Sequence, residues 1–185
     1  MNLGFIGTGK ISSSVINGIC NSSIKYKKII ISSRNNKVAS QLKRKFKKIF
    51  IEKDNQKIVN NCNWIFLAVT PSVGKKIIKN LNFKSNQTII SFISTINIEN
   101  LKKMVKVKAN VVRAIPLPPI SLGKGPVPIC PPNKKVKDFF DQIGSTIQIK
   151  SEKLSINFWS MSGMMASYYN ICLLYTSDAA DESRG

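Results

Sequence analysis

Short apolar runs alternate along this chain with stretches whose apolar residues recur at helical spacing. The apolar runs predict strands at Leu3–Ile6, Lys28–Ser32, Ile49–Ile51, Asn63–Val69, Thr88–Phe92 and Asn110–Ala114. The stretches between them predict helices at Lys10–Cys20, Lys37–Lys48, Asp54–Asn61, Val73–Leu81 and Ile98–Met104. Short apolar strands separated by helices are typical of a parallel sheet covered on both faces. The pattern therefore predicts a doubly wound α/β fold with a mostly parallel sheet.

The pattern changes after Ala114, where prolines become frequent. Proline cannot donate a hydrogen bond to a sheet, so we predict a loop here with an edge strand at Val127–Cys130. A helix capped by Asn133 and a strand at Thr146–Lys150 follow. From Ser151, a candidate N-cap, the pattern is helical again. We expect residues 1–150 to form one domain and residues 151–171 to begin a second, helical domain that is truncated.

The last fourteen residues, CLLYTSDAADESRG, differ in composition from the rest of the chain. Lys, Ile and Asn are frequent before residue 172 and absent after it, whereas Asp178, Asp181 and Glu182 are three of only nine acidic residues. The segment resembles a translated sequencing adapter. We therefore interpret residues 172–185 as a non-native tail and leave them out of the fold prediction.

Composition narrows the function classes. The chain has no apolar run long enough to span a membrane and no signal peptide, which favours the cytoplasm. It has no histidine, so Ser-His triads, Cys-His dyads and histidine metal sites are excluded, and its four cysteines are scattered, so no metal is expected. The net charge of +20 comes mostly from Lys, with only 4 Arg. Specific nucleic-acid binders rely on Arg and interleaved aromatics, so we interpret the charge as a solvated surface and expect no specific nucleic-acid partner.

The turn after the first predicted strand carries the clearest motif. Its sequence GTGKIS reads Gly-x-Gly-x-x-Ser, between a strand and a helix. In dinucleotide-binding domains of the Rossmann type, the first Gly (here Gly7) makes the turn, and the second (Gly9) lets the backbone approach a pyrophosphate. The third position, here Ser12, must be small. The free amides of the helix N-terminus then face the phosphates.

The end of the second strand indicates which dinucleotide binds. NAD sites usually place Asp or Glu there for the ribose hydroxyls. This chain has Ser33 and Arg34 instead, and a guanidinium can pair with a 2′-phosphate. The sequence therefore predicts NADP(H) as the cofactor.

Five segments together resemble one family. LGFIGTGKI, SSRN, DNQKIV, WIFLAVTP and VVRAIPLPP…GKGP, in this order and spacing, are similar to motifs of pyrroline-5-carboxylate reductases. The resemblance covers about residues 1–165. It implies an NADPH-dependent oxidoreductase that reduces a cyclic imino acid in proline biosynthesis, and a full-length protein that forms a homodimer or higher homo-oligomer.

The resemblance also implies a set of cofactor-binding residues. Pyrophosphate contacts are implied for Gly7, Thr8, Gly9, Lys10 and Ile11. Adenosine-phosphate contacts are implied for Ser33 and Arg34, and an adenosine contact for Asn55. Contacts near the nicotinamide are implied for Ala68, Val69, Thr70, Pro71 and Pro116. In the family, groups that assist at the imine come from the helical domain, so we name no catalytic side chain.

Several departures from the family pattern leave alternatives open. Thr70 replaces a Lys, Leu117 replaces an Asn, and WSMSGMMASYY stands where the family has Ser-Gly-Ser-Gly-Pro-Ala-Tyr. A diverged imine or β-hydroxyacid-type reductase and a non-catalytic NADP-binding regulatory domain are therefore both retained. Arg113 fits either a clamp for a substrate carboxylate or, our preferred interpretation, a structural brace at a strand end.

Overall fold

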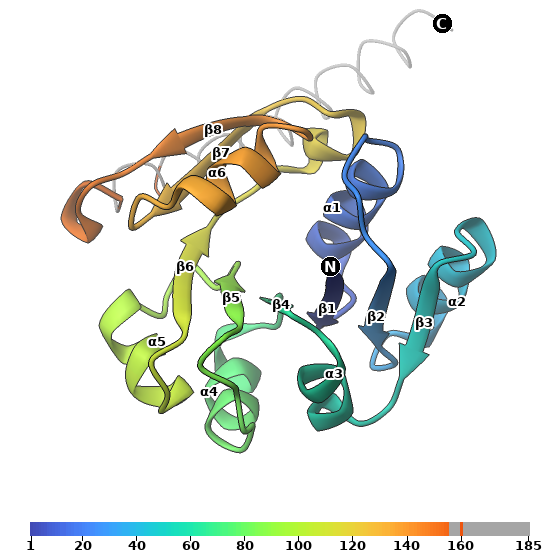
Figure 1. Cartoon of the computed structure of the whole chain (residues 1–185), viewed down its shortest axis with the longest axis horizontal. Coiled ribbons are helices and arrows are strands. Elements are labelled where there is room, and N and C mark those ends of the chain that lie inside the picture. The colour runs from blue at the N-terminus through green and yellow to red at the C-terminus, as the bar shows by residue number, and fades with distance from the viewer. Residues whose placement is uncertain (156–159, 161–185) are drawn as a thin grey trace, which may run out of the picture.

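The core of the protein is one eight-stranded sheet, in the order β3-β2-β1-β4-β5-β6-β7-β8. The structure is a computed structural model that describes residues 1–155 and 160 (Figure 1). The strands are β1 (Asn2–Ile6), β2 (Lys28–Ser32), β3 (Ile49–Glu52), β4 (Trp64–Leu67), β5 (Thr88–Ser91), β6 (Asn110–Ala114), β7 (Pro126–Cys130) and β8 (Ser145–Gln148). The helices are α1 (Lys10–Cys20), α2 (Asn36–Lys45), α3 (Asn55–Asn61), α4 (Pro71–Lys79), α5 (Ile98–Val105), the 3-10 helix η1 (Pro118–Leu122) and α6 (Lys134–Phe140).

Helices cover both faces of the sheet, as the apolar pattern predicts. One core cluster joins the strands to α1, α2, η1 and α6, and it contains stacked rings of Phe5 and Phe66 with centroids 4.3 Å apart. The second cluster joins the strands to α3, α4 and α5. Successive strand residues alternate between the two clusters, as Ile30 does between Ile29 and Ile31. The doubly wound, mostly parallel α/β fold is therefore confirmed.

The strand order reverses at β1. The chain first moves from β1 outward to β2 and β3, and it then returns to β4 on the other side of β1. All pairs from β3 through β6 are parallel. In an open sheet of this kind, ligands bind outside the carboxyl ends of the strands at this reversal point. The topology alone therefore places a candidate site beside the ends of β1, β2 and β4.

Strand β7 corrects one prediction, because it is an interior strand and β8 is the edge. It pairs antiparallel with β6 and parallel with β8. The carbonyls of Gly125 and Ile129 accept hydrogen bonds from Ser145, the first residue of β8, and from Ile149, just after it. The Pro128 carbonyl accepts from Ile115 on the other side. Pro126 and Pro128 share the side that faces β6, where the ladder has only two residue pairs. The prolines therefore lie where β7 needs few backbone N–H donors toward β6. For this reason β7 can be an interior strand although it contains two prolines.

Four helices begin at an Asn or Asp N-cap, of which Asn133 was predicted. Asn35, Asp54, Asn97 and Asn133 each accept a bond from an amide in the first turn of their helix. Ser151 Oγ accepts from the Leu154 amide at 3.4 Å, which confirms it as a cap for the helical residues 152–155. Helix α2 ends at Lys45, earlier than predicted, because Phe46 is extended and packs against the core. The rest of the predicted second domain and the tail, residues 156–159 and 161–185, lie outside the described residues.

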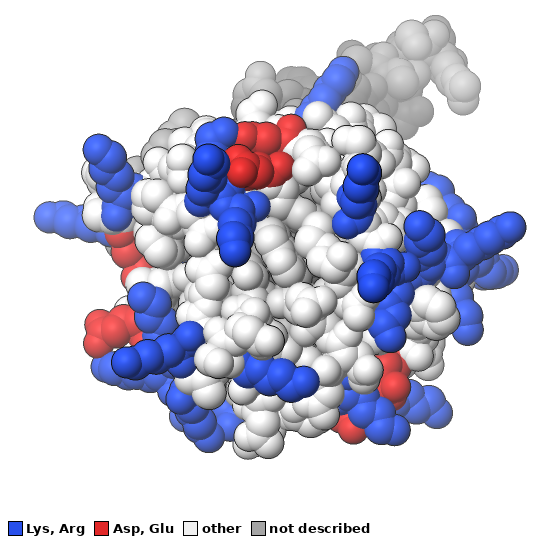
Figure 2. Space-filling model, in the orientation of Figure 1, with Lys and Arg blue, Asp and Glu red and all other residues white. Residues whose placement is uncertain are grey.

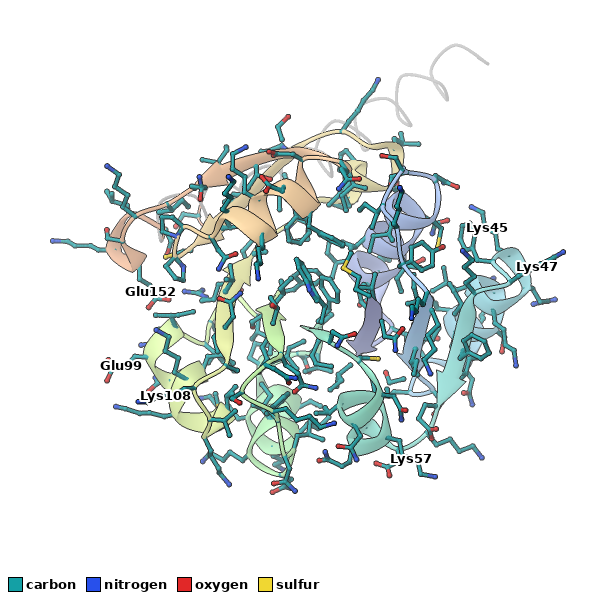
Figure 3. The ribbon with its side chains drawn as sticks, in the orientation of Figure 1. Lys45, Lys47, Lys57, Glu99, Lys108 and Glu152 are labelled. Carbon is teal, nitrogen blue, oxygen red and sulfur yellow. The ribbon has the colours of Figure 1, made fainter. Side chains whose placement is uncertain are left out.

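Basic side chains occupy much of the visible surface. Figure 2 shows them dispersed around the molecule and densest on the side where Figure 3 labels Lys45 and Lys47, at the end of α2. Lys45 is the last residue of α2 and Lys47 lies just after it, so both are at the opposite end of this helix from the β2 turn. Within the described residues, no helix combines the length and apolar character needed to cross a bilayer.

Candidate cofactor site

A cavity of about 450 Å³ opens at the carboxyl ends of β1, β2 and β4, at the reversal point of the sheet. Its lining comes from the three turns that follow these strands. The lining residues are Gly7, Thr8, Gly9, Arg34, Asn35, Asn36, Ala68, Val69 and Thr70. Seven of the nine are residues that the sequence analysis assigned to a cofactor site. The fold thus brings together segments more than sixty positions apart in the chain.

Gly7 forms the sharp turn that ends β1. Its φ is +103°, a conformation that L side chains rarely adopt. A Cβ atom here would lie 2.3 Å from the carbonyl oxygen of Ala68, which is backbone that cannot rotate away. The turn and β4 therefore approach each other as closely as they do only because residue 7 has no side chain.

Two buried serines hold this turn. Ser32 Oγ, at the end of β2, accepts the Gly7 amide at 2.9 Å, and the Ser32 carbonyl accepts the Thr8 hydroxyl at 3.1 Å. Ser12 Oγ donates to the Gly7 carbonyl at 2.7 Å. All three side chains, Thr8, Ser12 and Ser32, are buried. The third position of the motif is therefore small, as predicted, and it also satisfies a turn carbonyl.

Gly9 precedes α1 and faces open space. It is the N-cap of the helix, with ordinary extended dihedrals, and no side-chain cap competes for the first amides. A Cβ atom at Gly9 would have no heavy atom within 4 Å. The helix N-terminus, with its positive dipole, is thus open toward the cavity, an arrangement that suits a phosphate group.

The turn after β2 contributes the positive charge. Arg34 is exposed and lines the cavity, and no carboxylate is among the lining residues. Asn35 and Asn36 also line it, and sequence reasoning missed both. Asn35 accepts the Val38 amide and so begins α2 at the cavity wall. Its position just after a strand, as a helix cap, was the signal that could have identified it.

Six predicted residues do not line the cavity. Four of them flank its walls: Lys10 and Ile11 begin α1, Pro71 begins α4, and Ser33 follows β2, where its amide donates to the Glu52 carbonyl at 3.1 Å. The remaining two are Asn55 and Pro116.

Asn55 and Pro116 lie apart from the lining. Asn55 begins α3, and its buried Oδ1 has no hydrogen-bond partner among the described residues. Pro116 is buried between β6 and η1.

No nucleophile or metal cluster accompanies the cavity in the described part of the chain. Burial raises the pKa of the Cys20 thiol and that of the Cys130 thiol, and it raises the pKa of Cys62 to about 11. These three cysteines are therefore neutral thiols near pH 7. No group of three His, Cys, Asp or Glu side chains in residues 1–155 is placed to hold a metal ion. The lining can bind and orient a ligand, and it offers no side chain for covalent catalysis.

Arg113 is structural in the described residues. Its side chain is buried, pairs with Glu152, and donates from Nη2 to the carbonyl of Ser94. It braces the loop after β5, which agrees with the preferred interpretation of Arg113 as a structural brace at a strand end. With its guanidinium committed to these partners, it is not a clamp for a substrate carboxylate here.

A Gly-x-Gly turn, an open helix N-terminus and an arginine beside one cavity at the strand reversal define a dinucleotide-binding domain of the Rossmann class. The family model described as "NADP oxidoreductase coenzyme F420-dependent" matches residues 2–95, just over half of the 185 residues. The chain therefore belongs to this family of NADP oxidoreductases. No curated protein matches the sequence.

Solved structures with the same fold include reductases. Pyrroline-5-carboxylate reductase from Streptococcus pyogenes superposes with a TM-score of 0.76 at 24% identity, over 92% of this chain and 66% of that one. The Plasmodium falciparum pyrroline carboxylate reductase, solved with NADP bound, gives 0.79 at 24% identity, over 99% and 70%. A reductive aminase from Aspergillus terreus gives 0.72 at 10% identity, over 91% and 62%. The chain thus spans about two thirds of the length of these proteins.

Proposed function

We propose that this chain is the cofactor-binding part of an NADPH-dependent reductase that acts on a cyclic imine, as a pyrroline-5-carboxylate reductase does. The observation that carries the proposal is the cavity at the strand reversal, where the Gly7–Gly9 turn and Arg34 line one space and no carboxylate does. Membership of an NADP oxidoreductase family and the similarity to reductases of this kind support it.

Different residues of the cavity would bind different parts of NADPH. The amides at the start of α1, beside Gly9, would bind the pyrophosphate, since Gly9 leaves that approach open. Arg34 would pair with the 2′-phosphate of the adenosine. Ala68, Val69 and Thr70, after β4, would lie along the nicotinamide end. When bound, the reduced nicotinamide supplies a hydride, and the task of these residues is to hold it in one orientation.

The remaining parts of the reductase belong to the same proposal. Residues 1–150 would be the NADP-binding domain, and 151–171 would begin a helical domain that completes the substrate pocket and the homo-oligomer. Residues 172–185 would be non-native. The substrate would be a small imino acid, with proline as product, in the cytoplasm. Lys10, Ile11, Ser33, Asn55, Pro71 and Pro116 would make the outer cofactor contacts implied by the family resemblance.

Binding of the two reduced cofactors tests the proposal. NADPH and NADH are titrated into the chain, and nicotinamide fluorescence gives each Kd. We expect NADPH to bind at least tenfold more tightly, and equal affinities would contradict the cofactor assignment. The same preparation is assayed with pyrroline-5-carboxylate, where we expect little turnover. Rapid formation of proline by this chain would overturn the claim that a further helical domain is needed.

A binding-only role is the second candidate. Pro116, implied to face the nicotinamide, is buried outside the cavity lining, and Leu117 stands where the family has Asn. If the longest form of the protein binds NADPH and reduces neither pyrroline-5-carboxylate nor related imines and β-keto acids, this second role is favoured.

A further inference from the structure

The buried Arg113, near the end of β6, forms an ion pair with Glu152, a residue 39 positions further along the chain. The Arg113 side chain is 3% exposed and pairs through Nη1 with Glu152, whose side chain is 25% exposed. A second guanidinium nitrogen, Nη2, donates to the Ser94 carbonyl in the loop after β5. Removing one partner of a buried pair leaves an uncompensated charge, which is strongly unfavourable. The contact with Glu152 therefore favours the buried position of the Arg113 side chain.

The same carboxylate also completes the start of α5. Both oxygens of Glu152 accept the Ile98 amide, at 2.8 and 3.0 Å. Ile98 is the first residue of α5, where an amide has no partner within the helix and a negative charge is favourable. Figure 3 shows Glu152 beside the end of α5 that also carries Glu99. Glu152 thus joins the start of α5 to the end of β6, and Arg113 joins the end of β6 to the loop after β5.

The antiparallel direction of β7 explains why Glu152 lies beside the end of β6 and the start of α5. Cys130, the last residue of β7, pairs with Arg113, and the preceding Ile129 pairs with Gln148 at the end of β8. Both strands therefore end level with the carboxyl end of β6. Because β6 is parallel to β1 and β4 through β5, that end lies on the same sheet edge as the cofactor cavity.

We propose that Glu152 is a positioning residue. It holds the segment that begins at Ser151 against the carboxyl ends of the parallel strands, which we call the cofactor edge of the sheet because the cavity opens there. Moving the segment off this edge would separate Glu152 from both Arg113 and the Ile98 amide. Because Pro116 follows Arg113 by only three residues, the same contact ties residues 151–155 to the strand that leads into the loop implied to contact the nicotinamide. This last step rests on the proposed function, whereas the docking itself does not.

Amide hydrogen exchange, read residue by residue by NMR, tests the docking in the whole chain. In Glu152→Ala we expect exchange of the Ile98 and Ser155 amides to accelerate at least tenfold, because one loses its acceptor and the other its anchored helical turn. The amide of Phe66, in the central strand β4, should keep its protection. Glu99→Ala is the matched control, since it removes an exposed carboxylate from the same helix turn.

A double variant separates positioning from charge compensation. Arg113→Met/Glu152→Met removes both charges of the pair, so a role confined to charge balance predicts that protection returns at Ser155, while Ile98 has lost its acceptor in either case. Positioning by Glu152 predicts that protection at both stays lost while that of Phe66 is retained. Unchanged exchange in Glu152→Ala, recovery in the double variant, or parallel loss at Phe66 would each overturn the proposal.

Cofactor titration of the same samples keeps the two proposals apart. Failure of the unsubstituted chain to bind NADPH would refute the proposed function and leave the exchange result valid. We expect Glu152→Ala to bind NADPH within twofold of the unsubstituted chain, because Glu152 does not line the cavity.

Discussion

The two glycines of the first turn should fail in different ways when each is replaced by alanine. At Gly7, the φ of +103° alone makes a side chain strained by roughly 1–3 kcal/mol. The added Cβ would also lie 2.3 Å from the Ala68 oxygen and 2.7 Å from its carbonyl carbon. Because both atoms are backbone, β1 and β4 must move apart to relieve the contact. We expect Gly7→Ala to lower the free energy of unfolding by at least ~2 kcal/mol, from strain and lost packing together.

Gly9→Ala should leave stability nearly unchanged. The residue has φ −86° and ψ −171°, which any residue adopts, and its Cβ position has no neighbour within 4 Å. Alanine is a poorer N-cap than glycine, but it also loses less entropy on folding, so the net change should stay within about 0.5 kcal/mol. The methyl group would, however, occupy the space through which a pyrophosphate reaches the start of α1.

Urea unfolding followed by circular dichroism and NADPH titration together test this contrast. We expect the Kd for NADPH to rise at least tenfold in Gly9→Ala, which corresponds to ~1.4 kcal/mol of binding free energy. Normal NADPH binding by Gly9→Ala would refute the assignment of this space to the cofactor. Full stability of Gly7→Ala would refute the reasoning from the close contact.

Three further changes have defined outcomes. Arg34→Ala should weaken NADPH binding about tenfold or more with little effect on NADH, whereas Arg44→Ala, which removes the same charge from the far end of α2, should change neither titration. Ser32→Ala should lower the free energy of unfolding in urea by about 1–3 kcal/mol, because a buried turn amide loses its acceptor, and Ser33→Ala is the control that should not. The raised pKa of Cys62, about 11 against 9.0, means that the unfolded thiol ionises first. Stability that is fully present below pH 9 should therefore be lost progressively as the pH rises from 9 to 11, and Cys62→Ala should lack this part of the pH dependence.

The alternation of apolar runs and amphipathic stretches was enough to predict the sheet and its helices. Strands such as β2 and β6 match their predicted bounds, because apolar side chains are buried on both faces of a parallel sheet and leave an unbroken run. The Gly-x-Gly turn could also be predicted, because the local backbone conformation and one neighbouring strand both require glycine at position 7. Local chemistry of this kind can be seen in a single sequence.

Contacts between distant segments were not predictable in the same way. The interior position of β7 depends on which side of the strand its prolines face, and sequence spacing does not fix that side. Ser32 holds the Gly7 amide across 25 residues, and Glu152 reaches Ile98 across 54. Each contact follows from the strand order, so it becomes visible only when the sheet is assembled.

The return of β7 and β8 to the cofactor edge has a consequence for building hybrid enzymes. A chimera that joins this domain to a foreign helical domain after Gln148 would discard Glu152 and keep Arg113. Its success would depend on whether the incoming sequence supplies a carboxylate four residues past the junction. Arg113 therefore restricts which sequences can follow the junction. In a library of such fusions, the folded members should have Glu or Asp at the position of Glu152.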